Sequence, residues 1–161
     1  MNMIRVCKVV LVLSVGLFLT LAAINNLLGL DGAFGAVKGA VDMQATFKVP
    51  TLMWRAIESP ALVWLCVAGI VIAELVGGLL CLWGAIRLWS ARATAAAFNS
   101  AKSTAIVGLS VCAILYGLGF LAIGGEWFML WQNRGSPTLD EAFRQFVWPM
   151  LVMIWLNTAD E

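Results

Sequence analysis

The stretch PALVWLCVAGIVIAELVGGLLCLWGAIRLW, residues 60–89, decides the fold of this chain. A helix rises about 1.5 Å per residue, so this stretch is long enough to cross the ~30 Å hydrocarbon layer of a bilayer. Ahead of Arg87 it carries one charged residue, Glu74. So long an apolar run with so little charge predicts a transmembrane helix.

The rest of the chain has the same character. Of its 161 residues, 62% are hydrophobic and 12% are charged, whereas soluble domains are about one-half apolar and one-quarter charged. We therefore expect one integral membrane domain, residues 1–161, folded as an all-α bundle of four transmembrane helices. The predicted spans are residues 6–24, 60–89, 104–123 and 139–157. In the last span Pro149 removes a backbone donor and predicts a bend.

An outer insert, residues 25–59, separates the first two spans and is predicted to be partly helical. Apolar residues recur at helical spacing from Ala33 to Asp42, which indicates a short amphipathic helix on the membrane surface. Residues 51–58 predict a second short interfacial helix. Ser59 and Pro60 then suit the cap and first position of the second span.

Composition excludes several kinds of chemistry. The net charge is +1 and no basic arm is present, which argues against nucleic acid as a partner. There is no histidine, so His-ligated haem, His-containing zinc sites and His-based catalysis are excluded. The four cysteines show no CxxC spacing and are interpreted as buried thiols. We expect no cofactor, no metal and no catalytic residue, and the sequence favours a protein that is not an enzyme.

Four spans place both termini on the same side of the membrane. The short hinge between spans two and three carries Arg92 and Lys102 without an acidic residue, and Arg5 and Lys8 lie at the start of span one. Basic residues are concentrated in cytoplasmic loops, so we predict that both termini are cytoplasmic. The N-terminal stretch also fits a signal peptide, but its long apolar core and poor cleavage site favour a retained anchor.

Glu74 lies deep in the predicted hydrocarbon layer. An ionised carboxylate exposed to lipid there would be costly, so the side chain should face protein or water, or stay protonated. Gly69, Ala73 and Gly77 form a row of small residues that lets helices approach closely. Glu74 flanks this row and is predicted to point into the bundle.

The expected partners of Glu74 are polar side chains at matching depth on the other spans. They are Ser14 on span one, Ser110 on span three and the Trp155 indole on span four. We interpret Glu74 as a protonated group, hydrogen-bonded to one of these, that fixes helix register. The alternatives are a titrating group in a transport path and a contact with a partner subunit or lipid.

Glu126 lies at the outer end of the third span. Trp127 and Trp131 follow it and share one face if the helix continues. Three arginines are within plausible reach of Glu126: Arg55, Arg134 and Arg144. One interpretation is an interfacial ion pair that holds the outer loops together. The other is a docking site for a lipid headgroup, a quinone or a partner protein.

Four motifs carry a resemblance to a known family. They are GGEWFMLW at 124–131, AFR at 142–144, MWRAI at 53–57 and AEL at 73–75. With them, nearly the whole chain resembles the bacterial family of predicted small integral membrane proteins of unknown function. The loop QNRGSPTLDE differs from that family, which has a Trp-Asn-Gly type of turn at this point. The resemblance implies a four-span bundle in the bacterial inner membrane, and it implies no reaction and no catalytic residue.

Three classes of function follow from these observations. The first is a non-catalytic accessory or scaffold subunit of a larger membrane complex, with membrane lipid as the other partner. The second is a small proton-coupled transporter centred on Glu74. The third is a membrane enzyme or a membrane protein that binds a lipid or a quinone, in either case through Glu126 and Arg144.

Overall fold

The computed structural model describes residues 2–133, 135 and 137–160, and this part of the chain is helical, without strands. The longer helices are α1 (Met3–Leu28), α2 (Leu30–Val41), α3 (Pro60–Ser90), α4 (Ala95–Ala101), α5 (Ser103–Ile114), η2 (Leu115–Trp127) and α6 (Thr138–Asn157). Two single turns of 3₁₀-helix complete the set, η1 (Met53–Arg55) and η3 (Leu130–Gln132).

Three helical segments are long and apolar enough to cross a membrane, namely Met3–Leu28, Pro60–Ser90 and Ala95–Trp127. The all-α class is therefore confirmed, and three of the predicted spans coincide with these segments, each of which is at least as long as predicted. The third segment joins α4, α5 and η2 end to end. The fourth predicted span corresponds to α6. The first two turns of α6 contain Asp140, Glu141 and Arg144, so this helix is less apolar than the three long segments.

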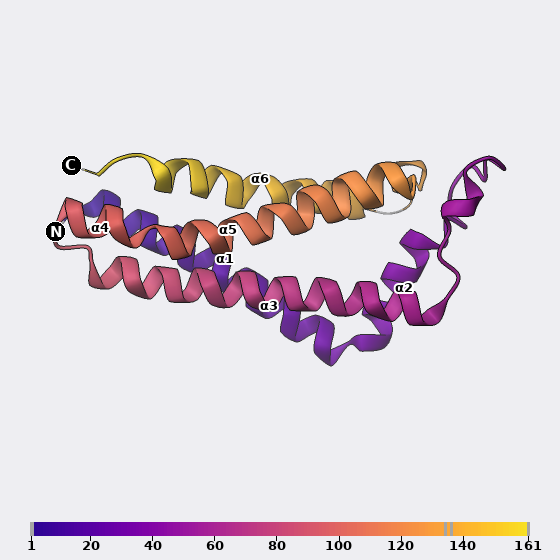
Figure 1. Cartoon of the computed structure of the whole chain (residues 1–161), viewed down its shortest axis with the longest axis horizontal. Helices are drawn as coiled ribbons and strands as arrows, with labels where there is room; N and C mark the ends of the chain where they lie inside the picture. Colours follow the sequence, from indigo (N-terminus) through magenta and orange to yellow (C-terminus); the bar gives the residue numbers. More distant parts are fainter. Residues whose placement is uncertain (1, 134, 136, 161) are drawn as a thin grey trace.

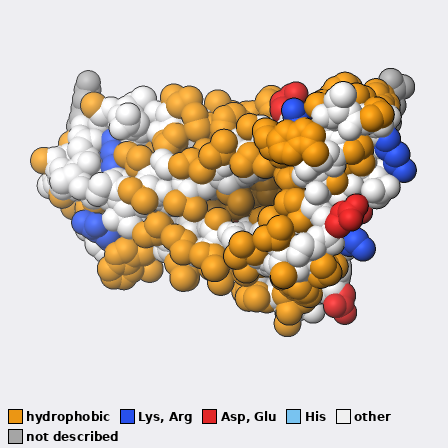
Figure 2. All heavy atoms as spheres, turned by 45° about the vertical axis from the view of Figure 1, so that its right-hand side comes forward, with side chains coloured by type: hydrophobic (Ala, Val, Ile, Leu, Met, Phe, Trp, Pro, Cys, Tyr) orange, Lys and Arg blue, Asp and Glu red, His pale blue; other side chains and the backbone are white. Residues whose placement is uncertain are grey.

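The helices run back and forth along one long axis (Figure 1). Both ends of the chain lie at the same end of the bundle, here called the terminal end, and α2 lies toward the opposite end, here called the loop end. Charged side chains gather near the two ends, and hydrophobic ones cover the middle of the face shown in Figure 2. This banding is what a bilayer requires of a protein that crosses it.

Close packing around α3 depends on glycine. A Cβ atom on Gly84 would lie 2.7 Å from the backbone of Ala105 on α5, and one on Gly78 would lie 2.9 Å from the backbone of Thr20 on α1. Gly77 has side chains from both neighbours within contact distance. The prediction that Gly69 belongs to a closely packed row of small residues is wrong, because nothing lies within 4 Å of a Cβ atom at Gly69.

The insert between α1 and α3 begins with a second helix almost immediately. Only Gly29 separates α1 from α2, which folds back against the loop-end half of α3. The predicted helix at 33–42 is thus present and starts three residues earlier. The second predicted helix, at 51–58, is wrong because those residues form only the η1 turn. The start of α3 agrees with prediction, with Ser59 as N-cap and Pro60 first.

The second half of the third segment is a π-helix, which the sequence analysis did not anticipate. η2 has 13 residues, and the Phe128 N–H donates to the Ile123 carbonyl, five residues back, at 3.0 Å. Long π-helices are rare, and π-turns are frequent at functional sites. The helix ends at Trp127, and two residues later Met129 has a left-handed φ of 58°. The chain then turns into α6, which begins at Thr138 with Pro137 as its N-cap.

Candidate functional site

A cavity of about 390 Å³ lies between α2, α3 and η2 in the loop-end half of the molecule. The face of the molecule drawn in Figure 2 has a hollow that is ringed by hydrophobic side chains. The cavity is partly open to the surroundings, and its lining is overwhelmingly apolar. Its polar lining residues are Asn26, Glu74 and Thr138.

Small side chains create this space. On α2, Ala33, Ala36 and Ala40 face the cavity, and on η2 Gly119 and Gly124 do so. A Cβ atom on Gly119 would meet only the Leu115 side chain, at 3.9 Å. A wide π-helix with glycine on its inner face therefore leaves room where an α-helix bearing larger residues would fill it.

Glu74 is the charged residue of this cavity. The residue is 3% exposed, and its carboxyl group accepts a 2.8 Å hydrogen bond from the Asn26 side-chain amide on α1. The Tyr116 side chain, on η2, is a second hydrogen-bond partner. Both partners are neutral donors, and no Lys or Arg occurs among the described residues that line the cavity.

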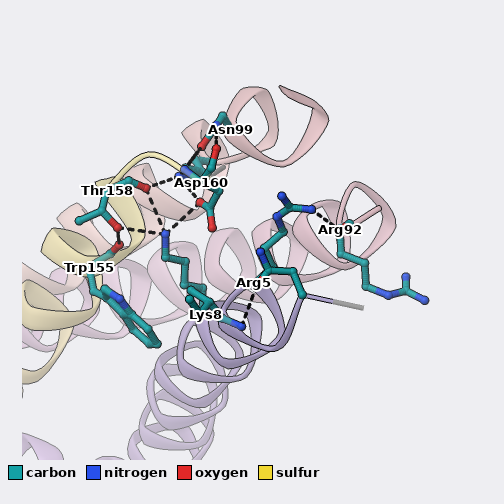
Figure 3. Close-up of polar contacts among 10 residues, drawn as sticks. Arg5, Lys8, Arg92, Asn99, Trp155, Thr158 and Asp160 are labelled. Carbon is teal, nitrogen blue, oxygen red and sulfur yellow. Dashed lines mark hydrogen bonds and ion pairs between the residues drawn. The ribbon is translucent and has the colours of Figure 1, made fainter. Parts of the chain in front are cut away.

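The three predicted partners of Glu74 are wrong. Ser14 donates instead to the Leu11 carbonyl at 2.7 Å, and Ser110 donates to the Ile106 carbonyl at 2.8 Å. Ser110 also faces Met153 on α6. Trp155 lies near the terminal end, where its carbonyl accepts from Thr158 (Figure 3).

The register between α1 and α3 explains the error about Ser14. Gly78 packs against Thr20, and the two helices are antiparallel. One turn further toward the loop end, Glu74 therefore lies opposite residues beyond Thr20. Of the two asparagines there, Asn25 is exposed and Asn26 contacts Glu74. Asn26 was assigned to the insert in the sequence analysis, because the predicted span ended at residue 24.

The predicted group around Glu126 is not assembled by the described residues. Glu126 and Arg144 are exposed, and no ion pair joins Glu126 to Arg55 or Arg144 in the described part of the chain. Arg134 lies outside the described residues. The helix ends at Trp127, so Trp127 and Trp131 do not share a helix face.

The two tryptophans instead tie the loops of the insert to the end of η2. The Trp127 ring packs edge-on against Trp54, with centroids 5.6 Å apart. The Arg55 guanidinium lies over Trp127, 4.6 Å from its centroid. Trp131 packs edge-on against Phe47 with centroids 6.1 Å apart. These contacts hold the loops of the insert against the end of η2 and against η3.

A second polar group, at the terminal end, was missed by the sequence analysis. The Asp160 carboxylate accepts from Lys8 at 2.9 Å and from Lys102 at 2.7 Å (Figure 3). Asn99 bonds to the Asp160 backbone, and both lysines also donate to the Thr158 carbonyl. The Asp160 side chain is 2% exposed. The cluster holds the C-terminal tail against α1 and the α4–α5 junction.

The charges around Asp160 determine its pKa. Burial raises the pKa of this carboxyl, but the hydrogen bonds and charges of Lys102 and Lys8 outweigh burial, so its pKa lies below the ordinary value. No signal in the sequence marks this cluster, because Asp160 lies 58 residues from Lys102 and 152 residues from Lys8 along the chain.

The described residues contain no group of three or more His, Cys, Asp or Glu side chains that could hold a metal ion. The chemistry available at the cavity is therefore that of one carboxylate with two neutral donors beside it. This arrangement can bind and orient a molecule within the apolar lining.

The fold and the cavity define a class of protein. Three long apolar helices, a hydrophobic middle and charged ends make the chain a small multi-pass integral membrane protein. More particularly, residues 4–159 match the family described as predicted small integral membrane protein, DUF2165, and the chain belongs to that family. Comparison with curated proteins and with solved structures gives no match.

Proposed function

We propose that this protein crosses the bacterial inner membrane four times, performs no reaction of its own, and binds an apolar molecule of the bilayer in the Glu74 cavity. The observation that carries the proposal is the cavity itself. It has about 390 Å³ of space, an apolar lining and polar groups confined to a few positions. Pockets for small molecules have this composition.

The four-span topology is supported by α6. It has 20 residues, about 30 Å of helix, and it packs beside α5 and η2. It brings the C-terminus back to the end where the N-terminus lies. The acid-free hinge with Arg92 and Lys102 is also at that end, which supports a cytoplasmic position for both termini.

A pair of reporter fusions tests this topology. Green fluorescent protein fused after residue 161 should fluoresce, and alkaline phosphatase at the same point should stay inactive. Alkaline phosphatase fused after Gly135, ahead of α6, should become active. Active alkaline phosphatase at both points, with no fluorescence from the fusion after residue 161, would show that α6 does not cross the membrane.

Binding is tested by what copurifies with the protein. The wild-type chain is purified in mild detergent and washed, and bound apolar molecules are extracted and identified by mass spectrometry. Gly119→Leu adds bulk to the cavity wall and should reduce the bound molecule. Gly69→Leu is the matched control, because Gly69 faces open space on α3. Equal amounts on all three proteins would overturn the proposal.

An accessory role is the second candidate. It is supported by the exposed surface at Gly69, where a neighbouring helix has room to approach closely. Purification of a tagged chain from its native membrane tests it. A stable larger complex that Gly69→Leu disrupts would support the accessory role, and a lone monomer would contradict it. Proton-coupled transport centred on Glu74 stays a further proposal.

A further inference from the structure

We infer that the ligand of the Glu74 cavity is a lipophilic cation, an apolar molecule that carries a positive charge at the end buried beside Glu74. This inference rests on the proposed binding function and names the chemical class of the ligand.

The charge balance of the cavity carries the argument. Glu74 is 3% exposed, and its hydrogen-bond partners Asn26 and Tyr116 carry no charge. No described lining residue is a Lys or Arg. The two ion pairs recorded for the described residues both involve Asp160, at the other end of the bundle. A bound cation would supply the positive charge that the described lining does not offer to a Glu74 carboxylate.

The hydrogen bonds around Glu74 fit this assignment. The Asn26 amide and the Tyr116 hydroxyl both donate toward the carboxyl group, as they would to an anion. They hold the carboxylate in place from α1 and η2 while it remains part of the cavity lining. A buried carboxylate that is already oriented loses little freedom when a cation binds, and the low dielectric of the cavity strengthens their attraction.

The remaining lining suits the rest of such a molecule. Phe120 and Phe128 line the cavity together with aliphatic side chains of α2 and α3. Aromatic faces attract cations, and the aliphatic lining accepts the apolar body. The partial opening of the cavity lies in the hydrophobic face of Figure 2, so a molecule dissolved in the bilayer reaches it without crossing water.

Two probes of nearly equal size and opposite charge test the inference. Tetraphenylphosphonium and tetraphenylborate are titrated separately against the purified full-length chain in lipid nanodiscs. Gly119→Leu discs serve as the blank, so that partitioning into lipid is subtracted. Wild-type protein should bind the phosphonium at least about tenfold more tightly than the borate.

Glu74→Gln is the matched variant, because the glutamine oxygen still accepts from Asn26. Its preference for the phosphonium should fall to near unity, while monodispersity and thermal unfolding show that it is folded. The comparison of the two probes on wild-type protein needs no variant, so a misfolded Glu74→Gln leaves the test intact.

Equal binding of the two ions above the blank, or preference for the borate, would overturn the inference while leaving a binding cavity in place. A neutral molecule found in the extract of wild-type protein, together with failure of the phosphonium to bind, would do the same. If neither ion binds above the blank and nothing copurifies with wild-type protein, both the inference and the proposed function fail.

Discussion

The side-chain amide of Asn26 donates a 2.8 Å hydrogen bond to the Glu74 carboxyl group, across the interface of α1 and α3. The bond joins residues 48 positions apart in sequence. It satisfies part of the hydrogen-bonding demand of a carboxyl group that is almost wholly buried. It also places that group at a cavity lined by α2 and η2, so one contact links helix register to the candidate site.

Removing the Asn26 amide should therefore destabilise the bundle. Asn26→Ala leaves Glu74 short of one donor, and a buried polar group left unsatisfied costs about 1–3 kcal/mol. We expect the thermal unfolding midpoint in detergent to fall. Asn25→Ala is the control, because Asn25 is exposed and adjacent. Equal midpoints for the two variants would contradict the structural importance of the bond.

Gly84 should not tolerate a larger residue. A Cβ atom there would lie 2.7 Å from the Ala105 backbone, so α3 and α5 would have to separate. Gly84→Ala should cost about 1–3 kcal/mol, the range for overpacking a close contact. Gly69→Ala makes the same chemical change in open space and should be neutral or mildly stabilising. Chemical unfolding of both variants in mixed micelles measures the difference.

The Asp160 cluster predicts a dependence of stability on acid. The pKa of the folded carboxyl is below its ordinary value, which is about 4. Its contribution to stability is therefore fully present above pH ~4 and is lost as the pH falls through the lower, folded-state pKa. Between neutral pH and pH 3, wild-type protein should lose more stability than Asp160→Asn. Parallel curves for the two proteins would refute a role for this carboxylate in acid unfolding.

The cysteines offer a direct probe of cavity access. Cys66 lines the cavity and is partly exposed, whereas Cys81 and Cys112 are 0% exposed. In a chain with Cys7→Ser, a small membrane-permeant methanethiosulfonate should modify Cys66 and spare the other two. Gly119→Leu should slow this modification, because it reduces the space beside the thiol.

Peptide mass spectrometry identifies the modified residue at each time point. Gly69→Leu, which adds the same bulk outside the cavity, should leave the rate at Cys66 unchanged. Modification of Cys81 or Cys112 as fast as Cys66 would show that the helices do not pack as described.

Much of this architecture follows from the sequence. The apolar runs around Val12, Val71 and Leu109 are long enough to define three membrane helices, and Ser59–Pro60 marks where one of them begins. The amphipathic spacing near Phe34 indicates α2. These features are readable because length, hydropathy and capping are properties of neighbouring residues along one chain segment.

The candidate site was only half readable. A carboxylate at position 74 in an apolar run is conspicuous, since burying it demands a partner. The identity of that partner is not conspicuous, because it depends on how far α1 is displaced along α3. Gly78 on α3 and Gly16 on α1 set that displacement by allowing the two helices to approach closely at particular points. Counting residues from predicted helix ends cannot recover it, and it led to Ser14 instead of Asn26.

By itself, then, the sequence determined that this is an integral membrane protein, that its helices form a bundle, and that Glu74 is a candidate functional residue. Only the tertiary structure decided that Glu74 meets Asn26 and Tyr116, that η2 widens into a π-helix beside a cavity, and that Asp160 returns to Lys8 and Lys102. Burial of apolar surface acts on each segment separately, whereas a cavity or an ion pair exists only where two segments meet in a particular register.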